Sequence, residues 1–97
     1  MAIQAFSNHA TEVLFKEGIA KKAVGWHNVS KVALRKLDML HYAAKLTDLK
    51  SPPNNRLKAL KGNLKGKYSI RINDQWRLVF LWTDLGPTEV EIMDHHK

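Results

Sequence analysis

The segment SPPNN, residues 51–55, divides the chain into two halves whose hydrophobic residues recur with different periods. Adjacent prolines cannot continue a helix and asparagine favours turns, so any preceding helix must end here. Before this segment, apolar residues follow the 3.6-residue spacing of amphipathic helices; after it, they alternate as in strands with one buried face. The sequence therefore predicts an α+β fold, with two N-terminal helices packed on one face of a mainly antiparallel sheet.

The first half predicts a short strand and two helices. The strand is AIQAF, residues 2–6, and the first helix lies in SNHATEVLFKEG, with Ser7 or Asn8 as its cap and Gly18 as its end. A longer helix is expected from a cap at Asn28 to about residue 46. Its apolar stripe consists of Val29, Val32, Ala33, Leu37, Leu40 and Ala44.

The second half predicts four strands in a meander. NRLKALKG suggests a short strand, and KYSIRI, WRLVFLW and TEVEIM are rich in β-branched and aromatic residues. The turns between the last three are NDQ, residues 73–75, and DLGP, residues 84–87.

A three-residue loop at 73–75 would place Arg71 opposite Arg77 on the sheet face away from the helices. Like charges directly across a ladder destabilise it, so something must offset this pair. A bound anion, an acidic neighbour such as Glu89 or Glu91, or splaying of both side chains into solvent would each do so. The same register gives a core face made of Tyr68, Ile70, Ile72, Trp76, Leu78 and Phe80.

The net charge of +7 is concentrated in one segment. Residues 50–77 contain a single acidic side chain, Asp74, and eight basic ones: Lys50, Arg56, Lys58, Lys61, Lys65, Lys67, Arg71 and Arg77. Such a basic segment is typical of a protein that binds a polyanion, although a solvated lysine-rich surface has the same composition.

Composition excludes several classes of protein. With no cysteine, the chain can have neither disulfides nor a thiolate site. The longest apolar run, residues 78–82, is far shorter than the ~20 residues of a membrane helix, and no secretory signal is evident. We expect one domain over residues 1–97, in the cytoplasm, with no membrane segment and no cofactor.

The chain ends on EIMDHHK, for which three interpretations are open. It could be a frayed tail. It could bind a metal, but consecutive side chains of an extended chain point to alternate sides, which suits joint coordination poorly, so no metal is expected. It could be catalytic, because histidine transfers protons at neutral pH.

The catalytic interpretation fits RNA cleavage. The 2′-hydroxyl of RNA can attack the adjacent phosphate without a metal if a base removes its proton, an acid protonates the leaving 5′ oxygen and cations stabilise the charge at phosphorus. The cations available for this are Lys58, Lys61, Arg71 and Arg77.

The sequence PPNNRLKALKGNLKGKYSIRINDQWRLVFLW, with LFKEG before it and EIMDHHK after it, closely resembles plasmid-maintenance killer proteins, the HigB branch of RelE-like toxins. This resemblance implies a compact RelE-like fold and a ribosome-dependent endoribonuclease that cleaves mRNA in the A site. It also implies a helix-turn-helix antitoxin similar to HigA, which neutralises the toxin and carries the complex to operator DNA.

The resemblance also implies roles for individual residues. Asp94 and His96 match the Asp and His of the family, with His96 the first choice for proton transfer, and His95 stands where relatives often have Tyr. Arg77 matches an arginine that stabilises the scissile phosphate, and Lys61 matches a basic active-site position. The residues expected to bind RNA or phosphate are Arg56, Lys58, Lys65, Lys67, Arg71 and Gln75.

Strand alternation conflicts with part of this assignment. Counted from Val90, it places Asp94 and His96 on the core side and His95 on the face of Arg77, unless the chain bends after Met93. Two other functions also fit the basic segment: an RNA- or ribosome-binding module that blocks translation without cutting, and a regulator that binds an acidic protein.

Overall fold

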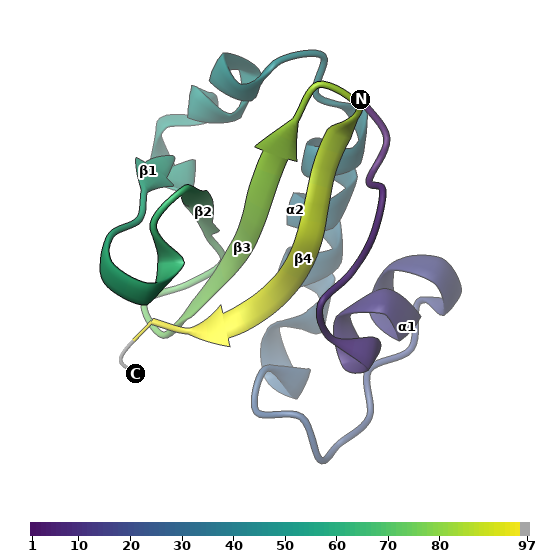
Figure 1. Cartoon of the computed structure of the whole chain (residues 1–97). Coiled ribbons are helices and arrows are strands. Elements are labelled where there is room, and N and C mark those ends of the chain that lie inside the picture. Colours follow the sequence, from purple (N-terminus) through teal and green to yellow (C-terminus); the bar gives the residue numbers. More distant parts are fainter. Residues whose placement is uncertain (96–97) are drawn as a thin grey trace.

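Four antiparallel strands in the order β1-β2-β3-β4 form the centre of the molecule (Figure 1), a computed structural model that describes residues 1–95. The helices are α1 (His9–Glu17) and α2 (Ser30–Tyr42). The strands are β1 (Lys58–Ala59), β2 (Lys67–Arg71), β3 (Trp76–Thr83) and β4 (Gly86–Asp94). Short 3-10 turns cover His27–Val29, Leu46–Lys50, Pro53–Asn55 and Gly62–Leu64. The predicted α+β class is confirmed.

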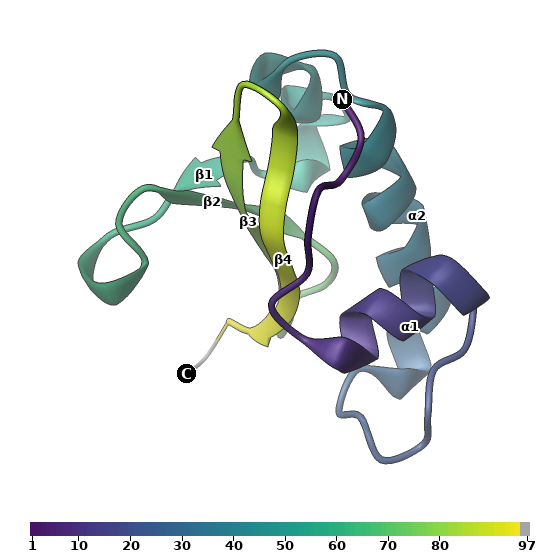
Figure 2. The same cartoon turned by 45° about the vertical axis from the view of Figure 1, so that its right-hand side comes forward.

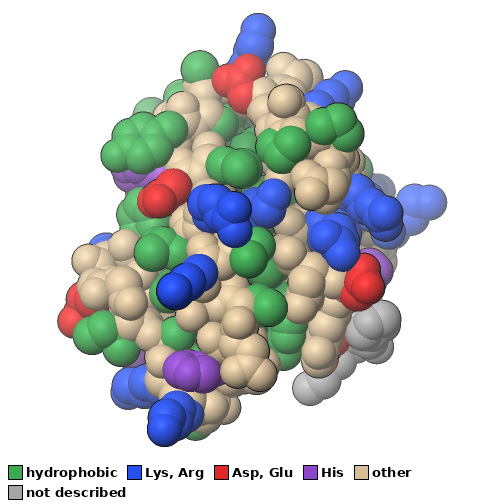
Figure 3. Space-filling model, turned by 180° about the vertical axis from the view of Figure 1, so that it is seen from behind, with side chains coloured by type: hydrophobic (Ala, Val, Ile, Leu, Met, Phe, Trp, Pro, Cys, Tyr) green, Lys and Arg blue, Asp and Glu red, His purple; other side chains and the backbone are tan. Residues whose placement is uncertain are grey.

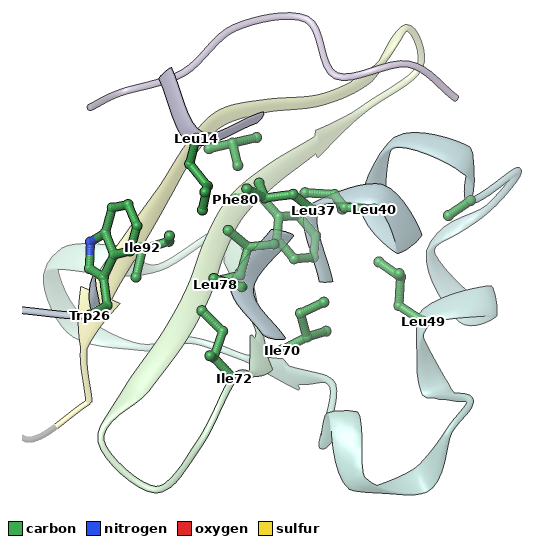
Figure 4. Close-up of a cluster of buried hydrophobic side chains, with 13 residues drawn as sticks. Leu14, Trp26, Leu37, Leu40, Leu49, Ile70, Ile72, Leu78, Phe80 and Ile92 are labelled. Carbon is green, nitrogen blue, oxygen red and sulfur yellow. The ribbon is translucent and has the colours of Figure 1, made fainter. Parts of the chain in front are cut away.

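The helices lie on one face of the sheet and leave the other face open. Helix α2 packs against β3 and β4, and α1 contacts both α2 and β4. Figure 2 shows both helices on one side, while the loop after β1 projects to the opposite side. Leucine, isoleucine, tryptophan and phenylalanine side chains fill the space between helices and sheet (Figure 4): Leu14, Trp26, Leu37, Leu40, Ile70, Leu78, Phe80 and Ile92.

The register of the β2–β3 hairpin is the predicted one. Arg71 pairs with Arg77, and the Ile72 N–H donates to the Trp76 carbonyl at 2.9 Å, which leaves residues 73–75 as the loop. The side chain of Asn73 closes this loop by accepting hydrogen bonds from the N–H groups of Gln75 and Trp76, at 2.9 and 2.7 Å. The second turn is shorter than predicted, because β4 already begins at Gly86.

Helix α1 begins and ends as predicted. The Asn8 side chain accepts hydrogen bonds from the backbone N–H and the hydroxyl of Thr11, and Gly18 ends the helix in the left-handed conformation at φ 70°. Thr11 is fully buried, and its hydroxyl oxygen accepts the Ile92 N–H at 3.1 Å. The cap therefore also fixes α1 to β4.

The strand predicted at residues 2–6 is wrong. The segment runs parallel to β4 and exchanges backbone hydrogen bonds with Pro87 and Val90, but only Phe6 forms a bridge. A continuous ladder is prevented because Pro87 has no N–H, and because β4 is irregular at Glu89, whose φ is 50°.

The predicted limits of the second helix are also wrong. Asn28 lies inside a 3-10 turn and is not its cap, and the helix ends at Tyr42. Ala43 takes an extended conformation, and its carbonyl accepts a hydrogen bond from the ammonium group of Met1. Because the chain leaves the helix here, Ala43 is buried and Ala44, which the stripe included, is exposed.

The two candidate caps of α1 give a matched stability test. Asn8→Ala should lower the free energy of unfolding by about 1 kcal/mol, because the Thr11 N–H loses its acceptor. Ser7→Ala should change it little, since Ser7 is exposed. Urea denaturation of both variants measures this; an equal loss in the two would contradict the assignment of Asn8 as the cap.

Candidate functional site

The candidate site lies on the open face of the sheet, where Arg77 is buried with its charge unneutralised. The side chain is 7% exposed. Its Nε donates to the Ser69 hydroxyl at 2.7 Å, and its Nη2 donates to the Arg56 carbonyl at 2.8 Å. Both acceptors are neutral, and no carboxylate among residues 1–95 forms an ion pair with Arg77. The guanidinium is thus fixed in orientation while its charge is available to an external anion.

A pocket of about 170 Å³ opens beside this guanidinium. Arg77 and Ser69 from the sheet meet Asp94 and His95 from the end of β4 in its wall. The rest of the lining is apolar: Leu60, Leu64, Val79 and Met93. One cation, one imidazole and one carboxylate residue therefore share a small, partly apolar cavity.

Gln75 in the β2–β3 loop holds the end of β4 in place. Its carbonyl accepts the His95 N–H at 2.5 Å, and its side-chain amide donates to Asp94 Oδ2 at 3.1 Å. Gln75 was expected to bind RNA; here it positions the two residues beside Arg77. The hairpin loop and the chain end are thereby joined into one site.

No bend follows Met93. The strand continues through Asp94, with Met93 opposite Arg77 on the open face and Asp94 opposite Trp76. His95, in the turn after the strand, lines the Arg77 pocket, which is the side that alternation predicts. Asp94 lines the same pocket, so its predicted place on the core side is wrong. His96 lies outside the described residues.

Four of the other predicted basic residues surround this face. Lys58 on β1 is exposed and pairs with Ser69, so it projects on the side of Arg77. Lys61 and Lys65 flank the turn Gly62–Leu64 and are exposed. Arg56 has a left-handed backbone, with φ at 49°, and its carbonyl accepts the hydrogen bond from Arg77.

Two of the predicted basic residues are engaged elsewhere. Arg71 does not share the Arg77 pocket: its Nη2 donates to Asp74 Oδ1 at 2.7 Å, and it lines a second cavity near α2. Lys67 forms an ion pair with Glu89 at 3.3 Å. Of the alternatives for offsetting the arginine pair, an acidic neighbour is therefore found for Arg71, but it is Asp74, while Glu89 pairs with a lysine.

Burial lowers the pKa of Arg77 below its usual value, and the positive charges of Arg56 and Arg71 lower it further. Burial removes water from the charged guanidinium, and the two neighbouring arginines add positive charge that no described carboxylate pairs with at Arg77. A bound anion would relieve all three.

Sequence reasoning missed the residues that hold Arg77. Its acceptors are the hydroxyl and the carbonyl of Ser69 and the carbonyl of Arg56, and Asn73 sets the loop that aligns it. Ser69 had a signal: in KYSIRI it is a small polar residue on the face that the predicted register gives to Arg71 and Arg77. The carbonyl of Arg56 had none, since a backbone group carries no sequence information.

Among residues 1–95, no three His, Cys, Asp or Glu side chains lie close enough together to hold a metal ion. Over the same residues, no helix has the length and apolar character needed to cross a membrane.

The fold matches that of a chain in a solved protein complex. The chain superposes on the YoeB–YefM complex from Staphylococcus aureus with a TM-score of 0.55 and 24% identity, over 98% of this chain and 99% of that one. With two helices on one face of a four-stranded antiparallel sheet, and a match to a RelE-like toxin family over residues 4–96, it has the fold of a RelE-like toxin.

Sequence comparison narrows this class. The family described as the RelE-like toxin of type II toxin–antitoxin system HigB matches residues 4–96. Toxin HigB-1 of Vibrio cholerae is 44% identical over 70 residues, 72% of this chain and 73% of that protein. An uncharacterized protein of Haemophilus influenzae is 45% identical over 53 residues, 55% of this chain and 52% of that protein. The chain belongs to the HigB family of type II toxin–antitoxin toxins.

The contact between Arg77 and Ser69 can be measured directly. Ser69→Ala should lower the free energy of unfolding by about 1.5–3 kcal/mol, because a buried charged donor loses its acceptor. In an Arg77→Met background the same substitution should cost much less, since the donor is gone. Urea denaturation of the four proteins in this cycle gives the coupling energy. A coupling near zero would show that Ser69 does not hold the guanidinium.

Proposed function

We propose that this toxin is a ribosome-dependent endoribonuclease that cleaves mRNA in the A site and so stops translation. The observation that carries the proposal is the buried, unneutralised guanidinium of Arg77 in a pocket that it shares with His95. A phosphate in this pocket would lie between a fixed cation and a group that can transfer a proton at neutral pH. The proposal places the protein in the cytoplasm, where ribosomes are.

The reaction uses the RNA's own nucleophile. The 2′-hydroxyl loses its proton to a base and attacks phosphorus, the bond to the 5′ oxygen breaks, and an acid protonates that oxygen. The products are a 2′,3′-cyclic phosphate and a 5′-hydroxyl. The nucleophile lies inside the substrate, so the step needs no metal ion and no cofactor, and DNA cannot react in this way.

The described residues support separate roles. Arg77 stabilises the charge that develops on the phosphate oxygens, because its hydrogen bonds to Ser69 and Arg56 aim it before substrate arrives. We assign proton transfer to the terminal histidines, with His96 as the first choice and His95 as the imidazole inside the pocket. We assign a positioning role to Asp94, which accepts a hydrogen bond from the Gln75 side chain.

The exposed lysines of the open face would bind the RNA backbone. Lys58 projects beside Ser69, and Lys61 and Lys65 lie on the loop that borders the pocket. The proposal gives Lys61 a place near the reacting phosphate and Lys58 a phosphate-binding role. Lys67 contributes less, because Glu89 already pairs with it.

The proposed partner is a helix-turn-helix antitoxin similar to HigA, which neutralises the toxin and brings the complex to operator DNA. The family's description as part of a type II toxin–antitoxin system supports an antitoxin partner. The solved YoeB–YefM complex, a relative in fold, is itself an assembly of two proteins.

Cleavage on translating ribosomes tests the proposal. Mapping of mRNA 5′ fragments should show ends within or beside the A-site codon. Arg77→Ala should slow cutting by roughly 10²–10³-fold, as loss of a transition-state donor does. His96→Ala should slow it by roughly 10²–10⁴-fold, and the same assay on His95→Ala shows which histidine transfers the proton. Ribosome association should persist in all three.

The control is Lys22→Ala, which removes an exposed charge that does not line the Arg77 pocket. Circular dichroism confirms folding of each variant, and Arg77→Lys, which keeps the charge but not the two-pronged geometry, should also cut slowly. Folded Arg77 variants that cut at the wild-type rate would refute the site. Wild-type protein that binds ribosomes without producing fragments would favour the non-catalytic RNA-binding module.

A further inference from the structure

A second cavity, of about 210 Å³, lies between α2, the segment 52–54 and the end of β2. Three cations line it, Arg35 and Lys36 from α2 and Arg71 from β2, and none of its lining residues is acidic. Its floor is apolar and includes Val32, Met39 and Ile72. Figure 3, which shows the helix-bearing face, has Lys and Arg side chains in a band across its middle. This cavity is separate from the Arg77 pocket.

Lys36 is the unusual member of this group because it is buried. The residue is only 8% exposed, yet no acidic residue among 1–95 pairs with it. Its ammonium donates one hydrogen bond, to Asn55 Oδ1 at 2.5 Å. Asn55 is itself fully buried and donates to the carbonyls of Leu49 and Ser51, at 3.2 and 3.3 Å. The lysine is therefore held in place by a neutral group, with further N–H donors still available.

The electrostatics of the cavity favour an anion. Burial lowers the pKa of Lys36, and repulsion from Arg35 and Arg71 lowers it further. Asp74 compensates Arg71 in part, through its hydrogen bond at 2.7 Å. No comparable acidic partner faces Arg35 or Lys36 among the described residues, so an anion would relieve the remaining repulsion.

Arg71 links this cavity to the Arg77 pocket. It lies directly opposite Arg77 in the β2–β3 ladder, and its charge lowers the pKa of both Arg77 and Lys36. Arg71 therefore acts electrostatically on cations of both sites, as one polyanion that spans them would require. Two guanidinium groups and an ammonium suit the several acceptor oxygens of a phosphate.

We infer that the cavity between α2 and the end of β2 binds a phosphodiester group of RNA, as a second phosphate site outside the candidate catalytic pocket. The inference rests on the proposed function in taking RNA as the polyanion. Arg35 and Lys36 bind and position the strand at this site and take no part in bond cleavage.

Binding of a single-stranded oligonucleotide with 2′-O-methyl groups, which cannot be cleaved, tests this inference by fluorescence anisotropy over a range of salt concentrations. For the wild type, the logarithm of affinity falls linearly with that of salt, by about 0.7 per phosphate contact in single strands. Arg35→Ala should bind more weakly, with a slope smaller in magnitude by about 0.7. Arg35 is exposed, so this variant should fold normally.

Lys22→Ala is the matched control, because it removes the same charge from an exposed position outside the cavity. Lys36→Met should reduce the slope as Arg35→Ala does, which a role confined to holding Asn55 would not produce. If Arg35→Ala and Lys22→Ala show the same affinity and slope, the second site is refuted. If Arg35→Ala weakens binding of a polyglutamate peptide but not of the oligonucleotide, the cavity serves an acidic protein and the inference is equally refuted.

This test is independent of cleavage. Wild-type cutting on ribosomes together with an unchanged slope in Arg35→Ala would overturn the second site alone. A reduced slope in Arg35→Ala without any cutting by the wild type would overturn the proposed catalysis alone.

Discussion

Two hydrogen bonds to one side chain set the geometry on which the site depends. Asn73 accepts the N–H groups of Gln75 and Trp76 and so closes a three-residue loop. That loop fixes the register of β2 and β3, and with it the face on which Arg77 lies. A slip of one residue would turn every side chain of the strand over and bring Arg77 into the apolar core. The same loop supplies Gln75, which holds the end of β4 beside the guanidinium.

The register brings two arginines face to face, and the structure relieves this in two different ways. Arg77 is buried and receives neutral acceptors, which keep its direction fixed and its charge intact. Arg71 turns to Asp74 and towards α2, where it lines another cavity. The basic segment is therefore not one uniform surface. It divides into a pocket on the open face, a cavity behind β2 and exposed lysines around the loop 61–65.

Patterns that depend on neighbours in the chain were predictable. The hairpin register followed from loop length and alternation, and both ends of α1 followed from Asn8 and Gly18, because these signals act within a few residues. Features set by distant contacts were not predictable. At the early end of α2 the Ala43 carbonyl accepts a hydrogen bond from the Met1 ammonium, and the N-terminal segment donates to Pro87 in β4; both partners are distant in sequence.

In the candidate site, too, features set by chain neighbours were predictable and features set by distant contacts were not. Alternation placed His95 on the side of Arg77, where it lies, but it also placed Asp94 on the core side, whereas Asp94 lines the same pocket. The resemblance supplied Arg77 itself. The partners of Arg77 were missed, because they come from the next strand and from a backbone carbonyl 21 residues away in sequence. Sequence patterns identify which charged side chains lie on the same face of the sheet. The hydrogen bonds that fix the orientation of those side chains come from residues distant in sequence, so the patterns do not show them.

The most direct measurement is a crystal structure of the toxin bound to an RNA fragment with a 2′-deoxy nucleotide at the cleavage position. The account predicts a phosphate within about 2.7–3.2 Å of the Arg77 guanidinium, with the imidazole of His95 or His96 next to its 5′ oxygen. A phosphate bound away from this pocket, with Arg77 still contacting only Ser69 and Arg56, would contradict it.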